Sequence, residues 1–312
     1  MKNTIPISGK ILVTGGSGFI GSHLVEFLST LNVQIDIIDF VKPSAALAIP
    51  HRFFQIDLND YLSSPECDLS QYDYIFHLAG NAHPFPSVEN PVKDFNMNLN
   101  TTLSFLEALK KISKRPILIN MSSAAVYGNP AVLPIKETDA TVPLSPYGVS
   151  KLAGEKYVTV YSNLFGIRAM SLRPFSVYGP RTRKQVVYDL MNKLAMDSST
   201  LEVYGNGKQM RDFVYVEDLV AAMCLVAVKG EAKGEVYNVA SGKSVTILEI
   251  AQIICRTLNI SPQIHFTGSV RAGEPDTWIV DIGKLANLGF KARTPIEKGI
   301  VNTYKWYKKS SQ

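Results

Sequence analysis

Short apolar runs alternate with amphipathic segments through the first half of the chain. The run Ile11-Leu12-Val13 is typical of a strand that is buried on both faces of a parallel sheet. Residues 19–28, which follow it, carry apolar side chains at helical spacing, and this predicts a helix. The repeated alternation predicts an α/β fold with a doubly wound parallel sheet and right-handed crossovers. The predicted strands are residues 10–13, 34–38, 52–55, 74–78, 117–121 and 169–172.

The second half of the chain is less regular and richer in loops after Pro174. We expect one large domain, residues 1–174 plus 212–241, and a smaller C-terminal lobe, residues 175–211 plus 242–312. The lobe is expected to bind substrate over the carboxyl edge of the sheet, where doubly wound folds bind their ligands. Helices are predicted at residues 95–113, 146–165 (with Ser145 as N-cap), 248–258 and 294–307. Loops are predicted at residues 180–183, 204–207 and 271–275.

Three glycines lie where the first predicted strand turns into the first helix. Gly15, Gly18 and Gly21 allow a tight turn and a close approach of the backbone to a pyrophosphate. The free amides of the helix N-terminus can hold the anion. Asp39 ends the next apolar run, about 20 residues further on, and can accept hydrogen bonds from a ribose diol. This combination predicts a dinucleotide-binding site at the first turn.

A tyrosine and a lysine lie one helical turn apart in the predicted helix 146–165. Tyr147 and Lys151 therefore face the same way. A tyrosine with a pKa of about 10 is a poor base at neutral pH, and a nearby ammonium group favours the phenolate. Ser123 follows the predicted strand 117–121, which delivers its hydroxyl group to the same edge of the sheet as the glycine turn. We predict Ser123, Tyr147 and Lys151 as the catalytic residues of a redox site.

The composition argues against a nucleic-acid-binding, metal-binding, secreted or membrane protein. The chain has 312 residues, 46% of them hydrophobic, and a formal net charge of +5 without a clustered basic face, so no nucleic-acid partner is expected. Cys67, Cys224 and Cys255 have no metal-ligand spacing, which indicates reduced thiols and no metal site. No signal peptide is expected, and the apolar run 219–228 is too short to span a bilayer. We expect a cytoplasmic protein that does not bind membranes.

Several motifs together resemble the extended short-chain dehydrogenase/reductase family, and within it the UDP-glucose 4-epimerase-like branch of NAD-dependent nucleotide-sugar epimerases and dehydratases. The resemblance covers nearly the whole chain. It implies a Rossmann-type sheet, NAD as cofactor, a nucleotide-diphosphate sugar as substrate and a role in polysaccharide biosynthesis. It also implies a homodimer, in which helices 95–113 and 146–165 of two copies form a four-helix bundle. The motifs are T-G-G-x-G-F-I-G at residues 14–21, Ser123 with Tyr147 and Lys151, R-P-F-S-V-Y-G-P-R at 173–181, and the stretch 204–213.

The resemblance assigns further residues to the cofactor and the substrate. Asp39 repels a 2′-phosphate and so favours NAD over NADP, although Lys42 nearby keeps NADP open. Arg211 and Arg271 are expected to clamp the diphosphate, because guanidinium binds phosphate oxygens bidentately. His83 is either a sugar contact or a structural histidine. The implied cofactor residues are Gly15, Ser17, Gly18, Phe19, Ile20, Gly21, Asp39, Asp57, Leu58, Leu78, Ala79, Gly80, Asn98, Tyr147 and Lys151. The implied substrate residues are His83, Ser123, Ser176, Arg211, Arg271 and Trp278.

The residues after Ser123 separate the reactions that the resemblance allows. Related dehydratases carry an Asp-Glu pair there, whereas this chain has Ala124 and Ala125, and a methyl group cannot move a proton. The resemblance therefore implies an NAD-dependent 4-epimerase, most commonly of a UDP-hexose, which acts through a transient 4-keto intermediate. An NAD(P)H-dependent 4-ketoreductase of a 4-keto-6-deoxy nucleotide sugar stays open, as does a catalytically idle nucleotide-binding scaffold. The base is open among UDP, dTDP, GDP and CDP.

Overall fold

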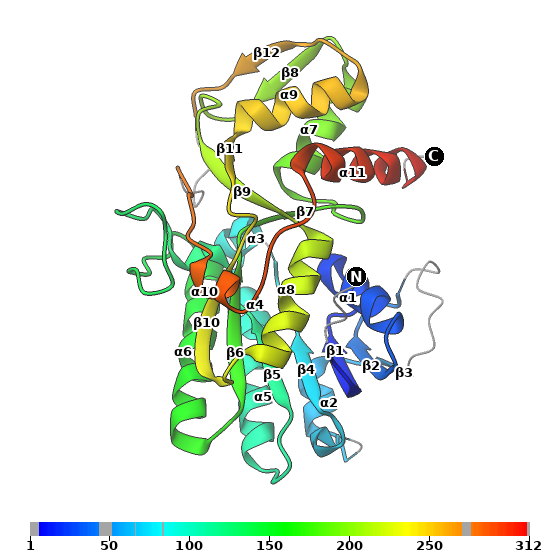
Figure 1. The fold of residues 1–312 in the computed structure, drawn as a ribbon, viewed down its shortest axis with the longest axis vertical. Coiled ribbons are helices and arrows are strands. Elements are labelled where there is room, and N and C mark those ends of the chain that lie inside the picture. The colour runs from blue at the N-terminus through cyan, green and yellow to red at the C-terminus, as the bar shows by residue number, and fades with distance from the viewer. Residues whose placement is uncertain (1–5, 44–51, 66, 83, 270–275, 311–312) are drawn as a thin grey trace.

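The structure, a computed structural model, describes residues 6–43, 52–65, 67–82, 84–269 and 276–310. A seven-stranded sheet forms its centre, in the order β10-β6-β5-β4-β1-β2-β3 (Figure 1). All of its neighbouring strands pair in parallel, so the predicted doubly wound Rossmann-type sheet is confirmed. Six of the seven strands were predicted, and the seventh, β10, was not. The strands are β1 (Gly9–Thr14), β2 (Val33–Asp39), β3 (Arg52–Gln55), β4 (Tyr74–His77), β5 (Ile117–Met121), β6 (Ala169–Pro174) and β10 (Lys233–Val239).

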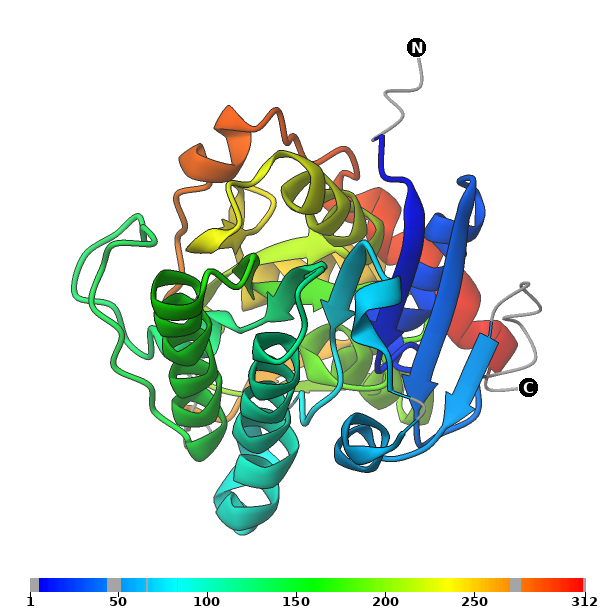
Figure 2. The ribbon, with the colours of Figure 1, turned by 90° about the horizontal axis from the view of Figure 1, so that it is seen from below.

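Helices cover both faces of this sheet, because its strands are apolar on both sides. One face packs on α1 (Phe19–Ser29) and α8 (Val216–Lys229), whose leucines and valines form a single buried cluster with the strands. The other face packs on α2 (Leu58–Ser63), α5 (Thr101–Lys110) and α6 (Pro146–Phe165). Figure 2 shows α5 and α6 side by side. Helix α6 has the predicted bounds, with the Ser145 side chain accepting a hydrogen bond from the amide of Gly148.

A smaller set of elements forms the C-terminal lobe at the top of Figure 1. Its strands form a three-stranded sheet, β11-β9-β7, and a parallel pair, β12-β8. The lobe has a core of its own, in which the apolar faces of α7, α9 and α11 meet. Its strands are β7 (Ser176–Tyr178), β8 (Thr200–Val203), β9 (Met210–Tyr215), β11 (Ser244–Thr246) and β12 (Gln263–Phe266), and its helices are α7 (Gln185–Met196), α9 (Ile247–Leu258) and α11 (Ile296–Ser310). Further short helices are α3 (Pro84–Glu89), α10 (Gly283–Asn287) and the 3-10 turns η1 (Leu69–Gln71) and η3 (Ala124–Val126).

The predicted helix 95–113 is wrong in its bounds and in its regularity. The structure has α4 (Pro91–Phe95), then a π-helical turn, η2 (Asn96–Asn100), and then α5. The buried Asn98 amide donates a hydrogen bond to Asp94 Oδ1 at 2.9 Å, and the Thr102 hydroxyl donates to the Asn98 carbonyl oxygen at 2.8 Å. These polar contacts accompany the wider turn, which apolar spacing alone does not reveal.

The other predicted segments agree with the structure to within a few residues. Helix α9 begins one residue earlier than predicted, and α11 covers Ile296–Ser310 rather than 294–307. Residues 180–183 and 204–207 are loops, with Gly205 and Gly207 both at φ +76°. The predicted loop 271–275 lies outside the described residues.

In the described part of the chain, no helix combines the length and the hydropathy that crossing a membrane requires. Across the same residues, no group of histidine, cysteine or acidic side chains is arranged to hold a metal ion.

Candidate active site

A cleft of about 1530 Å³ lies between the carboxyl ends of the sheet strands and the lobe. Its lining brings together most of the residues predicted for the site, from the glycine turn at one end to the lobe at the other. Those residues are Gly15, Ser17, Gly18, Phe19, Ile20, Gly21, Asp39, Asp57, Leu58, Leu78, Ala79, Gly80, Ser123, Tyr147, Lys151, Ser176, Arg211 and Trp278.

Of the predicted site residues that the structure describes, Asn98 alone is not among those that line the cleft. Asn98 is buried behind Gly80, and a Cβ atom on Gly80 would lie 2.5 Å from Asn98 Oδ1. Its amide is engaged by Asp94, so in this structure it shapes the wall from behind. His83 and Arg271 lie outside the described residues.

The three glycines of the turn differ in their surroundings. Gly15 and Gly21 allow close packing, whereas Gly18 leaves room for a ligand. Gly15 has φ +69°, and a Cβ atom there would lie 2.8 Å from the amide nitrogen of Ala79. A Cβ atom on Gly21 would lie 2.1 Å from the Gly15 carbonyl oxygen, so both positions exclude any side chain. Gly18 differs, because its φ is −72° and its Cβ would approach only the Gly15 oxygen, at 3.2 Å. The Gly18 position therefore opens onto the cleft.

Polar groups beside this turn fit a dinucleotide. The Ser17 hydroxyl is buried and has no hydrogen-bond partner among the described residues, so it is available to a ligand. Asp39 Oδ2 accepts from the Ser17 amide and Oδ1 from the Val41 amide, each at 3.0 Å, which fixes an anionic carboxylate at the end of β2. Asp57 caps α2, because its side chain accepts from the Asn59 amide at 2.8 Å. An unpartnered hydroxyl, an open Gly18 and a fixed carboxylate suit a pyrophosphate and a ribose diol.

The three predicted catalytic residues meet where β5 ends. Ser123 caps the turn η3, with its hydroxyl oxygen accepting from the Ala125 amide at 3.1 Å. The Tyr147 hydroxyl is hydrogen-bonded to Ser123. Lys151 Nζ donates to the Met121 carbonyl oxygen at 3.0 Å and lies 5.9 Å from the centre of the Tyr147 ring. A hydroxyl, a phenol and an ammonium group thus converge on one point of the cleft wall.

In the protein without a ligand, burial shifts the pKa values of both Tyr147 and Lys151. It raises the pKa of Tyr147 to about 12, with the nearby Asp94 carboxylate adding to the rise and the Ser123 hydrogen bond opposing it. Burial also lowers the pKa of Lys151 to about 8, and here the Asp94 carboxylate opposes the change. The lowered pKa predicted for Tyr147 beside Lys151 is therefore not seen in the protein alone, where burial is the largest influence on it.

The lobe contributes an arginine and a tryptophan to the opposite wall. Arg211, on β9, donates from Nη1 to the carbonyl oxygens of Met210 at 2.9 Å and Asp276 at 2.8 Å, and its guanidinium carbon lies 5.4 Å from the Trp278 ring centre. Trp278 is only 9% exposed, because its ring packs in a buried apolar cluster with Phe175, and its Nε1 donates to the Gly128 carbonyl oxygen at 3.1 Å. Trp278 therefore joins the lobe to the loop that follows Ser123.

The family model named "NAD dependent epimerase/dehydratase family" matches residues 11–240, which include the glycine turn and all three catalytic candidates. The chain belongs to this family. Its activity class is therefore that of an NAD-dependent enzyme of nucleotide-sugar chemistry.

Relatives in the epimerase/dehydratase family extend the match over the whole chain. A Methanocaldococcus jannaschii protein, provisionally named a UDP-glucose 4-epimerase, is 34% identical over 97% of this chain and 99% of its own. The solved UDP-N-acetylglucosamine 4-epimerase of Methanobrevibacter ruminantium M1 is 30% identical over 96% of this chain and 98% of its own, with a TM-score of 0.86. The UDP-glucuronic acid 4-epimerase of Bacillus cereus, solved with UDP-glucuronic acid and NAD, is 30% identical over 96% and 99%, with a TM-score of 0.85.

Sequence reasoning missed several charged residues of this family member's site. Arg183 and Lys184 line the cleft from the loop before α7, and Arg181 lines it with φ +72°. The signal was available, since three of the four residues 181–184 are basic beside a predicted loop. Asp94 and Glu155 had no such signal, because each acts through contacts that are distant in the sequence.

Proposed function

We propose that this chain is an NAD-dependent nucleotide-sugar 4-epimerase whose substrate is a UDP-hexose. The observation that carries the proposal is the shared lining of one cleft by Ser123, Tyr147 and Ala125. The first two can exchange a proton with a sugar hydroxyl, and the third offers only a methyl group where elimination of water would need an acid or base. The solved neighbours whose titles name UDP sugars support UDP as the base.

The glycine turn and the ends of β2 and β4 would hold the cofactor. The Ser17 hydroxyl and the open Gly18 position suit the pyrophosphate, and Asp39 suits the ribose diol and disfavours a 2′-phosphate. Bound NAD would supply the hydride acceptor and donor for C4 and, in its oxidised form, a positive charge in the cleft. The other cleft residues proposed for the cofactor are Gly15, Phe19, Ile20, Gly21, Asp57, Leu58, Leu78, Ala79 and Gly80.

Tyr147 moves the proton of the reaction. Its phenolic oxygen takes the proton of the C4 hydroxyl as the 4-keto sugar forms, and returns it when the opposite face of the sugar is reduced. Because burial raises the pKa of Tyr147 to about 12, the positive charges gathered at the site must lower it for this step. Ser123 holds the reacting oxygen and the phenol together, and Lys151 supplies one of the positive charges.

The lobe would hold the nucleotide while the sugar turns. Arg211 and Arg183 line the lobe side of the cleft, where guanidinium groups suit the diphosphate. The 4-keto sugar must present its other face before it is reduced, so the sugar has to be held more loosely than the diphosphate. Ser176 and Trp278 line the space between the diphosphate residues and Tyr147.

A proton NMR time course tests the proposal. The purified protein and NAD+ are incubated with UDP-, dTDP- and GDP-hexoses, and the anomeric signals are followed. Redistribution of one UDP-hexose between its C4 epimers, without net NADH, supports the proposal. Reduction of a 4-keto-6-deoxy nucleotide sugar by NAD(P)H, without any epimerisation, would make the enzyme a ketoreductase.

The enzyme is further proposed to be a homodimer. An apolar face covers α4 and α6, with Val92 (69% exposed), Phe95, Val149, Val160 and Leu164 (70% exposed). A second copy of this face would bury these side chains as a four-helix bundle.

Light scattering coupled to size-exclusion chromatography tests the dimer. Leu164→Asp should give monomers, because a carboxylate would be buried in the interface. Met196→Asp is the control, since Met196 is 87% exposed on α7, away from this face. A dimer that survives Leu164→Asp would contradict the proposed interface.

Two further assignments complete the proposal. The enzyme works in the cytoplasm on sugars for polysaccharide biosynthesis, and its three free cysteines are compatible with a reducing compartment. Residues 1–174 plus 212–241 form its NAD-binding domain, and residues 175–211 plus 242–312 its substrate lobe. The separate buried clusters of the sheet and the lobe support a division into two parts, although Leu285 and Phe290 pack in the sheet cluster and Phe213 and Tyr215 pack in the lobe cluster.

A further inference from the structure

Helix α6 carries a buried carboxylate, Glu155, on the same side as the two catalytic candidates. Tyr147, Lys151 and Glu155 are each four residues apart, so they lie along one side of the helix. All three contact the three consecutive residues at which β5 ends and η3 begins. The contacts are Tyr147 with Ser123, Lys151 Nζ with the Met121 carbonyl oxygen at 3.0 Å, and Glu155 Oε2 with the Ser122 hydroxyl at 3.0 Å.

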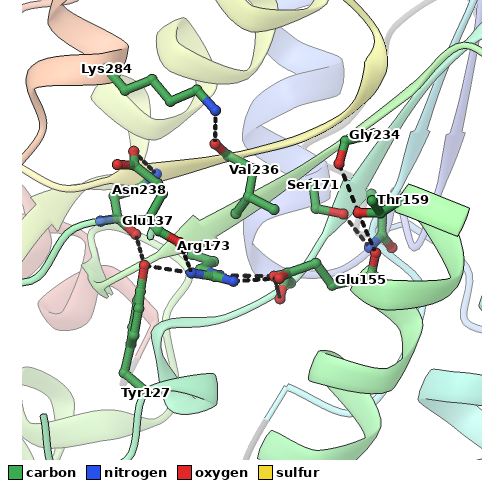
Figure 3. Close-up of polar contacts among 12 residues, drawn as sticks. Tyr127, Glu137, Glu155, Thr159, Ser171, Arg173, Gly234, Val236, Asn238 and Lys284 are labelled. Atoms are coloured by element: carbon green, nitrogen blue, oxygen red, sulfur yellow. Dashed lines mark hydrogen bonds and ion pairs between the residues drawn. The ribbon is translucent and has the colours of Figure 1, made fainter. Parts of the chain in front are cut away.

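Glu155 is itself held by a buried ion pair (Figure 3). The Arg173 guanidinium contacts both of its carboxylate oxygens, from Nε to Oε2 at 2.9 Å and from Nη2 to Oε1. The side chains are 2% and 1% exposed. The Arg173 guanidinium also donates to the Tyr127 hydroxyl at 2.6 Å, and that hydroxyl donates to Asn238 Oδ1 at 2.7 Å. The carboxylate therefore has a fixed place relative to β6 and β10.

The Glu155 carboxylate, which Arg173 holds in place, in turn holds the Ser122 side chain. The Ser122 hydroxyl is buried and donates to Glu155, while its amide donates to the Leu172 carbonyl oxygen at 2.8 Å. Ser123, whose hydroxyl bonds Tyr147, is the next residue. Stability alone does not explain the arrangement, because the cost of burying two charges offsets most of their attraction.

We propose that the Glu155–Arg173 ion pair is a positioning device, which sets the place of the Ser123 hydroxyl opposite Tyr147 through the Ser122–Glu155 hydrogen bond. The inference rests on the proposed function, since it gives the ion pair a part in the reaction of Ser123 and Tyr147. Glu155 and Arg173 are not among the residues that line the cleft, whereas Ser122 lines it with its hydroxyl group bonded to Glu155. The ion pair acts on Ser123 only through Ser122.

The test removes this one hydrogen bond and leaves the ion pair intact. Ser122→Ala should lower kcat about tenfold with KM changed by less than about twofold, because Ser123 would be displaced while the binding residues stay in place. The matched control is Thr159→Val, since the Thr159 hydroxyl lies one turn further along α6 and donates to the Gly234 carbonyl oxygen at 2.8 Å. It should cost similar thermal stability and leave kcat within about twofold of the wild type. Equal losses of kcat in both variants would overturn the proposal, as would a change in KM alone.

Amide hydrogen exchange of the free protein gives a second measurement that needs no activity. Ser122→Ala should speed exchange in residues 121–127, and Thr159→Val should speed it near Gly234 but not in residues 121–127. Unchanged exchange in residues 121–127 of Ser122→Ala overturns the positioning role. If the wild-type protein epimerises nothing while the two variants show the expected exchange, the proposed function is refuted. The placement of Ser123 by the ion pair is then still supported.

Discussion

On the sheet side of the cleft, Ser123, Tyr147 and Lys151 gather at the end of the fully buried strand β5, whereas on the lobe side the partly exposed Arg211 donates to two carbonyl oxygens, one of them in a loop. The sheet wall, defined by Ser123, Tyr147 and Lys151, rests on the Glu155–Arg173 ion pair and on the close-packed strand β5. The lobe wall, defined by Arg211, Trp278 and residues 204–207, rests on Met210, Asp276 and two glycines with positive φ.

This difference separates the chemistry from the recognition of substrate. A proton-transfer group needs a fixed position and a controlled pKa, and both come from packing in the core. A diphosphate clamp needs charge and reach, which exposed loops supply and can vary without disturbing the core. The following changes test how far the two walls are independent, from the largest expected effect to the smallest.

Tyr147→Phe removes from the sheet wall the phenol that is proposed to move the proton of the C4 hydroxyl. We expect kcat to fall by about 10²–10⁴, because the C4 hydroxyl loses its proton acceptor, with thermal stability retained. Tyr157→Phe is the control, since Tyr157 is on the same helix but 40% exposed outside the cleft lining. Steady-state rates of C4 epimerisation measure both. A Tyr147→Phe enzyme with more than about a tenth of the wild-type kcat would show that another group carries the proton.

Arg211→Met removes a cation from the lobe wall. We expect KM for the nucleotide sugar to rise by about 10- to 100-fold, because a charge-assisted hydrogen bond to phosphate is lost. The kcat should change little, since the sheet wall is untouched. Lys208→Met, two positions before β9 begins and outside the cleft lining, should leave KM unchanged. A loss that falls mainly on kcat would break the separation of the two walls.

His23 joins the two sides, because one of its ring nitrogens, Nε2, lies 2.8 Å from the Pro180 carbonyl oxygen at the mouth of the cleft. Burial lowers the pKa of His23 to about 4, from 6.5 in the unfolded chain. Between these values the unfolded chain binds more protons, so this contribution to stability is complete above pH 6.5 and falls as the pH falls toward 4. From pH 7 to pH 5 the loss is about 2 kcal/mol.

Denaturant unfolding at pH 7 and pH 5 measures this loss. His23→Gln should lose about 2 kcal/mol less than the wild type over that range, because glutamine does not titrate. The buried His77, whose pKa burial also lowers, to about 3, contributes equally to both proteins. His265→Gln, at an exposed position, should follow the wild type. Identical pH dependence in His23→Gln and the wild type would contradict the assignment to His23.

Gly18→Ala tests the glycine turn, which lies at the proposed cofactor end of the cleft. Its methyl group meets only the Gly15 oxygen, at 3.2 Å, so the fold should tolerate it, while the Kd for NAD rises about tenfold as space for the pyrophosphate is lost. Gly154→Ala is the control, because a Cβ atom there lies 3.5 Å from Thr102, on α6 and outside the cleft lining. Calorimetric titration with NAD measures both. Unchanged affinity in Gly18→Ala would place the pyrophosphate elsewhere.

Much of the fold and of the sheet wall was predictable, because local patterns specify it. Apolar runs and helical spacing predicted six of the seven sheet strands and the full extent of α6. The pair Tyr147 and Lys151 follows from the helical repeat alone. The π-helical turn Asn96–Asn100 was not predictable, since the apolar spacing of residues 95–113 does not distinguish it from a turn of regular α-helix.

The sequence by itself determined which chemical groups are present and which of them share a helix face or a strand end, because those relations depend on a few neighbouring residues. Only the tertiary structure decided that Glu155 meets Arg173 behind Ser123, because their contact joins a helix to a strand through the core. It also decided that burial raises rather than lowers the pKa of Tyr147. Solvation depends on everything packed around a group, and that arrangement exists only once the chain has folded.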